Sequence, residues 1–228
     1  MNGVLLINKP IGWTSFDVVN KIRAVITEEI NQKKRYPVGH AGTLDPLASG
    51  LLIILVGTYT KKAFELTKLD KEYSFTIKLG YTSTTDDEEG EKTATSIIQP
   101  TPDTVENAVH GFIKTYQQVP PIFSAIKVNG KRSYQLARQG SQVVLQPRSV
   151  TVKRLEVLNY SYPLVDLVAE VSSGTYIRSL AKDIGEELKT GGYVTKLTRT
   201  KVGQFSVHDA LDIEKISIQY ISANLLTL

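Results

Sequence analysis

One carboxylate stands out among the side chains of this sequence that could carry out chemistry. Asp45 lies in a segment punctuated by glycine and proline, residues 40–50, and a strongly apolar run over residues 51–57 follows at once. A loop held against a buried strand presents a reactive group rigidly, and carboxylates serve as nucleophiles in covalent catalysis. Asp before proline also commonly caps a turn, so this stretch alone leaves a purely structural role open.

Three further side chains accompany this carboxylate as candidates. His40 precedes it by five residues, Tyr73 begins a segment that alternates apolar and polar residues, and Arg178 follows a Gly-Thr-Tyr turn at the start of a predicted helix. Each also has an ordinary interpretation: a histidine with a structural hydrogen bond, a strand tyrosine facing the core, and an arginine on the surface of a helix.

Several familiar chemistries have little support. The sequence has no Walker-type phosphate loop, no GxGxxG after a strand and no GxSxG elbow. It has no cysteine, and its three histidines lack paired metal-ligand spacing. NTPases, dehydrogenases and serine hydrolases are therefore disfavoured.

Length and composition indicate a soluble globular protein. The chain has 228 residues, of which 41% are hydrophobic and 22% charged, and no linker or repeat divides it. The N-terminus lacks a signal-peptide pattern, and the longest apolar run is too short to span a bilayer. We expect one domain over residues 1–228 and a cytoplasmic location.

The distribution of charge favours a polyanionic partner. The net charge of +4 is modest, but residues 127–154 contain seven basic residues and no acidic one, and residues 189–203 contain four basic residues and no acidic one. A third basic cluster covers residues 31–36. Any one cluster alone suits a solvated face, whereas three together favour RNA or DNA.

The elements that must position these residues mix helices and strands. Periodicity and capping signals predict strands over residues 4–8, 51–56, 73–79, 123–128, 142–145, 150–160, 164–172 and 197–205. They predict helices over residues 16–26, 104–112, 133–139, 177–189 and 209–216, with residues 30–50 as loop. Since βαβ alternation is absent, we expect an α+β fold with a mixed, mainly antiparallel sheet.

Several ordered blocks resemble those of the TruB-type pseudouridine synthases. The matching blocks are residues 9–15, 42–46, 71–73, 173–180 and 197–205, and the resemblance runs from Val4 to Phe205. It implies a pseudouridine synthase fold and an isomerase (an intramolecular transferase) that converts uridine-55 in the T loop of tRNA to pseudouridine. No group leaves in this reaction, so the resemblance implies no cofactor and no metal.

The resemblance also implies roles for individual residues. Asp45 would be the catalytic nucleophile. It would attack C6 of the base or C1′ of the ribose, or it would drive the formation of a glycal. Arg178 would pair with it, because an adjacent guanidinium favours the charged carboxylate and orients it. Tyr73 would stack on the target base and assist catalysis.

Three residues would bind the substrate nucleotide. His40 would contact RNA where the target uridine leaves its stack, because a base inside a folded loop must be flipped. Tyr176 would lie near the bound nucleotide, and Leu197 would line the uracil pocket.

An inserted segment over residues 124–152 is expected to hold the RNA stem-loop. The residues predicted to contact the RNA backbone are Lys127, Lys131, Arg132, Arg138, Arg148, Arg199 and Lys201. The expected partner is the T stem-loop of tRNA. We expect the protein to be a monomer that binds no membrane and needs no obligate protein partner.

The departures from the family are mild at Ala41, Thr198 and Gln204. The 23 residues after Phe205 are too few for the usual C-terminal PUA domain, so we expect none.

Three alternatives compete with this interpretation. A non-catalytic tRNA-folding chaperone would need RNA contacts but none of the set Asp45, Tyr73 and Arg178. A catalytic subunit of a guide-RNA-dependent synthase would share the core but usually needs the C-terminal domain. A generic basic RNA-binding domain explains the charges but not the Asp45 loop.

Overall fold

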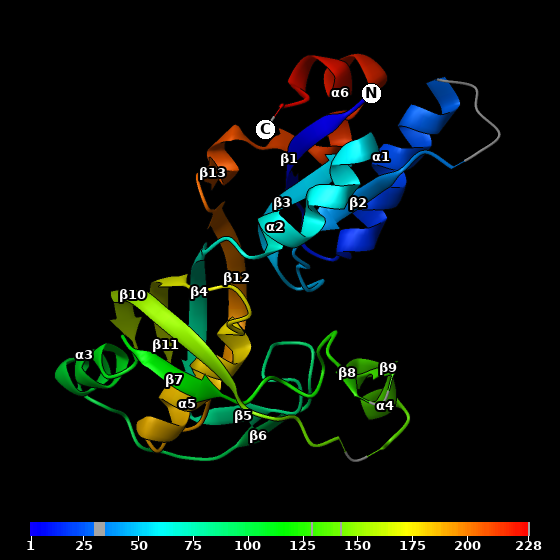
Figure 1. The fold of residues 1–228 in the computed structure, drawn as a ribbon. Coiled ribbons are helices and arrows are strands. Elements are labelled where there is room, and N and C mark those ends of the chain that lie inside the picture. The colour runs from blue at the N-terminus through cyan, green and yellow to red at the C-terminus, as the bar shows by residue number, and fades with distance from the viewer. Residues whose placement is uncertain (30–34, 129, 142, 228) are drawn as a thin grey trace. The chain divides into compact units, whose positions relative to one another are not determined.

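A computed structural model describes residues 1–29, 35–128, 130–141 and 143–227 (Figure 1). The chain forms two compact units. Unit 1 comprises residues 1–73 and 197–228, and unit 2 comprises residues 74–196. Strands β4 (Lys71–Leu79) and β12 (Gly192–Val202) each carry residues of both units.

Unit 1 is built on a mixed sheet. Its strand order is β14-β1-β3-β12, with β2 paired to β3 and β13 paired to β12. The bounds are β1 Gly3–Lys9, β2 Val38–Ala41, β3 Ser49–Val56, β13 Phe205–Ser206 and β14 Leu211–Asp212. β1 runs antiparallel to β3, whereas β12 runs parallel to β3. β3 is buried from Gly50 to Val56, which explains its continuous apolar sequence.

Helices pack around this sheet. Helix α1 (Ser15–Glu29) buries Val18, Val19, Ile22 and Ile26, which recur at helical spacing. The other helical segments of unit 1 are η1 Gly57–Lys62, α2 Ala63–Thr67, η2 Val207–Asp209, η3 Ile213–Lys215 and α6 Ile218–Asn224.

Unit 2 continues with antiparallel strands and two longer helices. Its strand order is β12-β4-β11-β10-β7. The bounds are β7 Thr115–Gln118, β10 Arg148–Ser161, β11 Leu164–Val171, α3 Pro102–His110 and α5 Ile177–Glu187. A short hairpin, β5 (Tyr81–Ser83) with β6 (Lys92–Ala94), lies beside them. Thr101 caps α3 by accepting a hydrogen bond from Thr104 N.

The predicted RNA-binding segment forms a small structure within unit 2. β8 (Lys127–Val128) and β9 (Lys131–Arg132) pair as a hairpin, and α4 (Ser133–Arg138) follows directly (Figure 1). Ser133 N donates to Ile126 O and Tyr134 N to Ser124 O, which ties the start of α4 to the segment that precedes β8.

The predicted α+β class with a mixed, mainly antiparallel sheet is confirmed, while several element boundaries are corrected. The predicted loop contains β2, the predicted strand over 123–128 is reduced to β8, and residues 143–145 form no strand. Residue 142 and residues 30–34 lie outside the described ranges. The predicted helix over 209–216 is instead two 3-10 turns and the short β14, because Ser206 and Asp212 cap the turns and Ser217 starts α6.

Across the described ranges, no helix combines the length and the apolar content needed to cross a membrane.

Candidate active site

The Asp45 loop, defined here as residues 42–48, joins β2 to β3 and is fixed by bonds from the start of α1. Ser15 Oγ donates to Leu44 O at 3.1 Å and accepts from Leu44 N at 2.8 Å. On the other side of Asp45, Gly12 N donates to Pro46 O at 2.8 Å. The backbone is therefore held on both sides of a partly exposed carboxylate, which suits a preorganised reactive group.

A buried lysine lies beneath this region. Lys9 is fully buried, and its ammonium donates to Pro10 O at 2.9 Å and Trp13 O at 2.7 Å. Burial lowers the pKa of Lys9 to about 8, opposed by the charge of Asp45 and reinforced by that of Arg199. Lys9 thus braces the turn into α1 and is electrostatically coupled to Asp45.

Arg199 is where the structure corrects the sequence prediction. Its side chain is 1% exposed. Its Nε donates to Leu51 O at 2.8 Å and its Nη2 to Gly42 O at 3.0 Å. A guanidinium enclosed in this way is not available to an RNA phosphate, so the predicted backbone contact of Arg199 is wrong.

Two predicted pocket residues are buried side chains of β4 and β12. Tyr73 is 9% exposed and Leu197 is 7% exposed, and both belong to unit 1. Beside them, Glu72 accepts a hydrogen bond from Thr200 Oγ1 at 2.8 Å and lies 3.2 Å from the exposed Lys201 ammonium. Lys201 remains on the surface, so its predicted phosphate contact stays a prediction.

His40 is a half-buried residue of β2. It lies opposite Ile54 of β3 and five residues before Asp45, at the entrance to the Asp45 loop. Its predicted contact with the flipped nucleotide also stays a prediction.

Arg178 lies at the start of α5 in unit 2, buried in a polar network. Its Nη1 lies 3.2 Å from Asp87 Oδ2 and donates to Thr85 O at 3.0 Å, while its Nη2 donates to Phe123 O at 2.8 Å. Both charged side chains of this ion pair are at most 5% exposed. The guanidinium is thus held in one orientation; its predicted pairing with Asp45, a residue of unit 1, stays a prediction.

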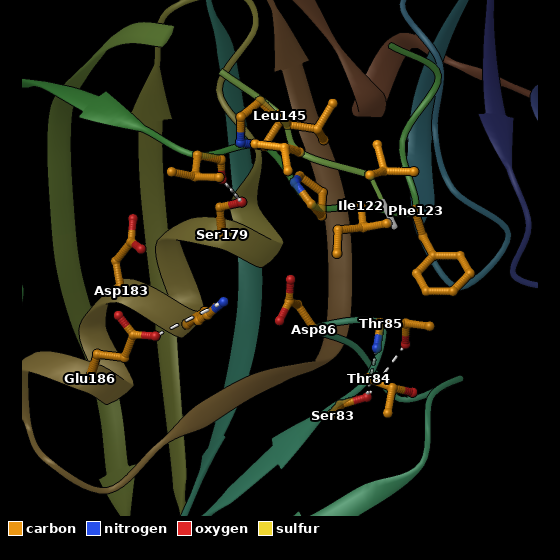
Figure 2. A pocket seen from close by; sticks show the side chains of 16 residues that line it. Ser83, Thr84, Thr85, Asp86, Ile122, Phe123, Leu145, Ser179, Asp183 and Glu186 are labelled. Carbon is orange, nitrogen blue, oxygen red and sulfur yellow. Dashed lines mark hydrogen bonds and ion pairs between the residues drawn. The ribbon is translucent and has the colours of Figure 1, made fainter. Parts of the chain in front are cut away.

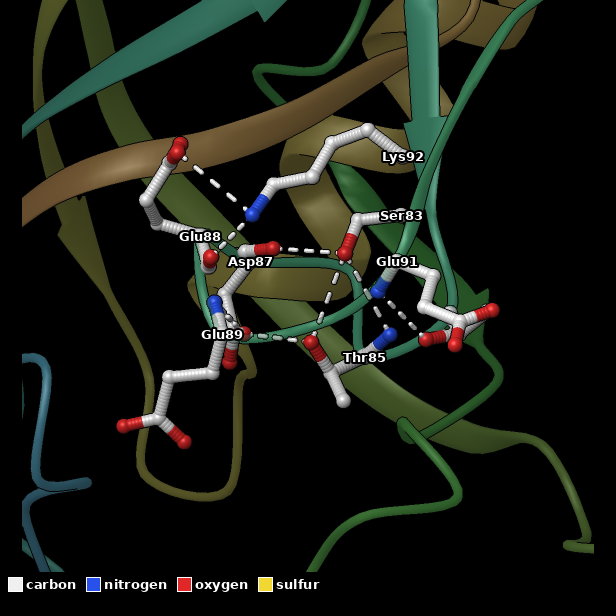
Figure 3. A network of polar contacts seen from close by, with 8 residues as sticks. Ser83, Thr85, Asp87, Glu88, Glu89, Glu91 and Lys92 are labelled. Carbon is white, nitrogen blue, oxygen red and sulfur yellow. Dashed lines mark hydrogen bonds and ion pairs between the residues drawn. The ribbon is translucent and has the colours of Figure 1, made fainter.

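Asp87 in turn is fixed by the loop after β5 (Figure 3). Its carboxylate accepts from Thr85 Oγ1 and from Glu89 N, and its backbone carbonyl accepts from Ser83 Oγ at 2.6 Å. Asp87 was not among the residues predicted from the sequence. It belongs to an acidic run, residues 86–91, and nothing in that run indicates that one of its members is buried.

Tyr176 is positioned by a second missed residue, Gln118. The Gln118 amide accepts from Tyr176 N at 2.8 Å and donates to Tyr176 O at 3.2 Å and to Tyr116 Oη at 2.8 Å. Tyr116 Oη donates to Asp183 at 3.0 Å. This chain of bonds fixes the turn that precedes Arg178.

A cavity of about 530 Å³ in unit 2 lies next to this network (Figure 2). It is enclosed by residues 83–86, 119–123 and 143–145 and by α5. Burial raises the pKa of Asp183 on its wall to about 6 and also raises that of Asp86. None of the predicted site residues is among those that line it.

The remaining predicted RNA contacts are on the surface. Lys127, Lys131, Arg132, Arg138 and Arg148 are all exposed, on β8, β9, α4 and the start of β10. Their exposure suits contacts with phosphates.

Comparison with known proteins identifies relatives along nearly the whole chain. A protein of Phocaeicola vulgatus named tRNA pseudouridine synthase B is 46% identical over 212 residues, which cover 92% of this chain and 90% of that protein. A protein of the same name from Clostridium novyi is 41% identical, over 97% of this chain and 74% of that protein. The family model described as the TruB family pseudouridylate synthase N-terminal domain matches residues 29–177. The model described as the tRNA pseudouridylate synthase B C-terminal domain matches residues 178–225.

A solved structure shares the fold. The crystal structure of a Cbf5-Nop10-Gar1 complex contains a chain with a TM-score of 0.71 and 28% identity, covering 96% of this chain and 54% of that one. The shared fold and the matches to both family models show that this protein is a pseudouridine synthase. Among these enzymes, the chain belongs to the TruB family.

Proposed function

We propose that this protein isomerises uridine-55 in the T loop of tRNA to pseudouridine. The observation that carries the proposal is the match of 92% of the chain to a relative named tRNA pseudouridine synthase B. The braced Asp45 loop supports it further, because a reaction without a cofactor depends on an accurately placed side chain.

The reaction leaves the atomic composition of the nucleotide unchanged. The C1′–N1 bond breaks, the uracil turns, and a C1′–C5 bond forms, while C5 loses its proton and N1 gains one. In this proposal the ionised carboxylate of Asp45 acts as the nucleophile. It adds either to C6 of the base or to C1′ of the ribose and leaves again as the product forms.

The other site residues have supporting roles in this proposal. The buried guanidinium of Arg178 pairs with the Asp45 carboxylate and keeps it charged and oriented. Tyr73 stacks on the uracil, Leu197 lines its pocket, and Tyr176 lies beside the nucleotide. His40 contacts the RNA where the target base is flipped out.

The exposed cations are proposed to bind the RNA backbone. The residues concerned are Lys127, Lys131, Arg132, Arg138, Arg148 and Lys201. Phosphate contacts of this kind add affinity without sequence specificity.

The proposal is tested by tritium release from a tRNA transcript whose uridines carry tritium at C5. We expect about one label per tRNA to be released without any guide RNA or cofactor, and none from a transcript with cytidine at position 55. Tight binding without release would favour the non-catalytic chaperone. Release that requires a guide RNA would favour the guide-dependent subunit.

A further inference from the structure

Arg199 has no assigned role once its phosphate contact is withdrawn. Its guanidinium bonds reach the start of the Asp45 loop and the beginning of β3, the strand into which the loop leads. Gly42 and Thr43, which accept at 3.0 and 3.4 Å, precede Asp45 by three and two residues, and Leu51, which accepts at 2.8 Å, follows it by six.

The backbone of Arg199 makes the same connection. Arg199 lies in register with Gly50, and Ser49 Oγ lies 2.9 Å from Thr198 Oγ1. A Cβ atom at Gly50, whose φ is +103°, would lie 2.3 Å from Arg199 O. Glycine is therefore needed there, and β12 packs against the exit of the loop without space for another side chain.

Arginine suits this position better than any other side chain. Its planar group offers five donors in a fixed fork, whereas lysine offers three on one flexible atom. The three acceptors are backbone carbonyls, and their separation requires donors spread over a plane. A lysine would keep the charge but not all three bonds.

We propose that Arg199 is a positioning residue, which fixes the Asp45 carboxylate for attack by holding the entrance and the exit of the Asp45 loop. It acts through the loop backbone and touches neither the RNA nor the reacting atoms. This proposal rests on the proposed function, because it assumes that Asp45 carries out the reaction.

The test compares Arg199→Lys with Val202→Ala. Val202 is fully buried in the same strand, so its truncation lowers stability while the guanidinium bonds of Arg199 are kept. We expect Arg199→Lys to slow single-turnover tritium release by about 10- to 100-fold with a tRNA Kd within about twofold of wild type, as for a misplaced catalytic group. Val202→Ala should keep the wild-type rate although its melting temperature is similar to that of Arg199→Lys or lower.

A second readout does not depend on activity. Amide hydrogen exchange over residues 42–48 should accelerate in Arg199→Lys and not in Val202→Ala. A wild-type protein that releases no tritium would contradict the proposed function, yet this comparison would still decide whether Arg199 holds the loop. The proposal would be overturned if Arg199→Lys left both the amide exchange and the rate of tritium release unchanged. It would also be overturned if weaker tRNA binding explained the whole loss of rate.

A separate observation concerns the surface beside the Asp45 loop. The turn before α1 displays Ile11, 70% exposed, and the first turn of α1 displays Phe16, 54% exposed. This turn is joined to the Asp45 loop by the bonds of Gly12 and Ser15. An apolar rim therefore lies next to the proposed nucleophile within unit 1.

Cations accompany the aromatic rings of this rim. Lys21 Nζ lies 5.6 Å from the centre of the Trp13 ring, and the Arg23 guanidinium lies 5.8 Å from that of Phe16. The acid of this turn, Asp17, is already bonded to Thr14 N and Oγ1. Apolar and aromatic surface interleaved with cations is suited to stacked bases and their phosphates.

We infer that Ile11 and Phe16 form a contact for a nucleobase of the RNA substrate next to the target uridine. Ile11→Ser and Phe16→Ser should each raise the Kd for the T stem-loop by about 5- to 30-fold while the single-turnover rate at saturation stays close to wild type. The matched control is Phe64→Ser, another exposed ring, with Lys68 Nζ 4.0 Å from its centre. Unchanged binding in both rim variants, or an equal loss in the control, would overturn the inference.

Discussion

Arg178 must keep one orientation if it is to orient a carboxylate, and its neighbours in unit 2 provide this. Asp87 neutralises the guanidinium, and the carbonyls of Thr85 and Phe123 each accept one hydrogen bond from it. Removing one member of a buried ion pair leaves an uncompensated charge, which typically costs more than the pair contributes.

We therefore expect Asp87→Ala to lower the free energy of unfolding by about 3 kcal/mol or more and to reduce tritium release sharply. Glu88→Ala is the matched control, because Glu88 forms a surface pair with Lys92 and its loss should cost less than about 1 kcal/mol. Urea unfolding of both variants measures the difference. Equal, small losses would contradict the role given to Asp87.

The buried carboxyl of Asp183 makes stability depend on pH. Burial raises its pKa from 3.8 to about 6 in the folded protein. Its stabilising contribution is therefore fully present below pH 3.8 and is lost as the pH rises through about 6. At pH 7 the folded protein carries a partly buried charge at Asp183.

Asp183→Asn removes this charge and keeps an oxygen that accepts from Tyr116 Oη. We expect the variant to be more stable than wild type by about 1 kcal/mol at pH 7, which is less than the full pKa shift would give because water screens this partly exposed side chain. At pH 4 the variant should lose this advantage. Urea midpoints at pH 4, 5, 6 and 7 test this. A difference that does not change with pH would show that Asp183 is not the titrating group.

At the scale of elements, the Asp45 loop depends on how closely β3 and β12 approach. Gly50→Ala would place a Cβ atom 2.3 Å from Arg199 O, whereas Gly12→Ala would meet no atom within 4 Å although φ is also positive, +84°. Both variants carry the strain of a left-handed residue, about 1 to 3 kcal/mol. Only Gly50→Ala also separates the two strands.

We expect Gly12→Ala to fold with a small loss of stability and Gly50→Ala to lose both stability and tritium release. Thermal unfolding and single-turnover rates of the two variants measure this. Comparable behaviour of the two alanine variants would contradict the close approach at Gly50.

Periodicity predicts the elements with long, regular patterns and fails for the short ones. α1 and β3 follow from apolar spacing, since each buries one stripe or a continuous run. The four-residue β2 contains Gly39 and His40 and is a strand because it pairs with β3. No local sequence pattern reveals this pairing. The burial of Arg199 is equally hidden, because its acceptors are backbone carbonyls about 150 residues away in sequence.

At the scale of the whole molecule, both units supply predicted site residues. Asp45, Tyr73 and Leu197 belong to unit 1, and Tyr176 and Arg178 belong to unit 2. The family blocks allow all five to be predicted from the sequence, because the motifs are local. Asp87, which pairs with Arg178, and Gln118, which bonds Tyr176, could not be predicted, because these partners are distant in sequence.

The exposed cations of unit 2 should make RNA binding depend on salt. Each phosphate contact contributes about 0.7 to 0.9 to the slope of log K against log salt concentration. Lys131→Ala combined with Arg132→Ala should lower that slope by roughly 1.5. Lys215→Ala, which removes an exposed cation beside Asp212, should leave it unchanged. Equal slopes for wild type and the double variant would exclude these residues from the RNA interface.

The central claim is that the Asp45 carboxylate carries out the reaction, and single-turnover tritium release by Asp45→Asn tests it most directly. Asparagine has nearly the same shape, and Ser15, Gly12 and Arg199 hold the loop through hydrogen bonds to backbone atoms. The variant should therefore bind the T stem-loop with an affinity close to that of wild type and release no tritium above background. Release at a rate near that of wild type would contradict the assignment of Asp45 as the nucleophile.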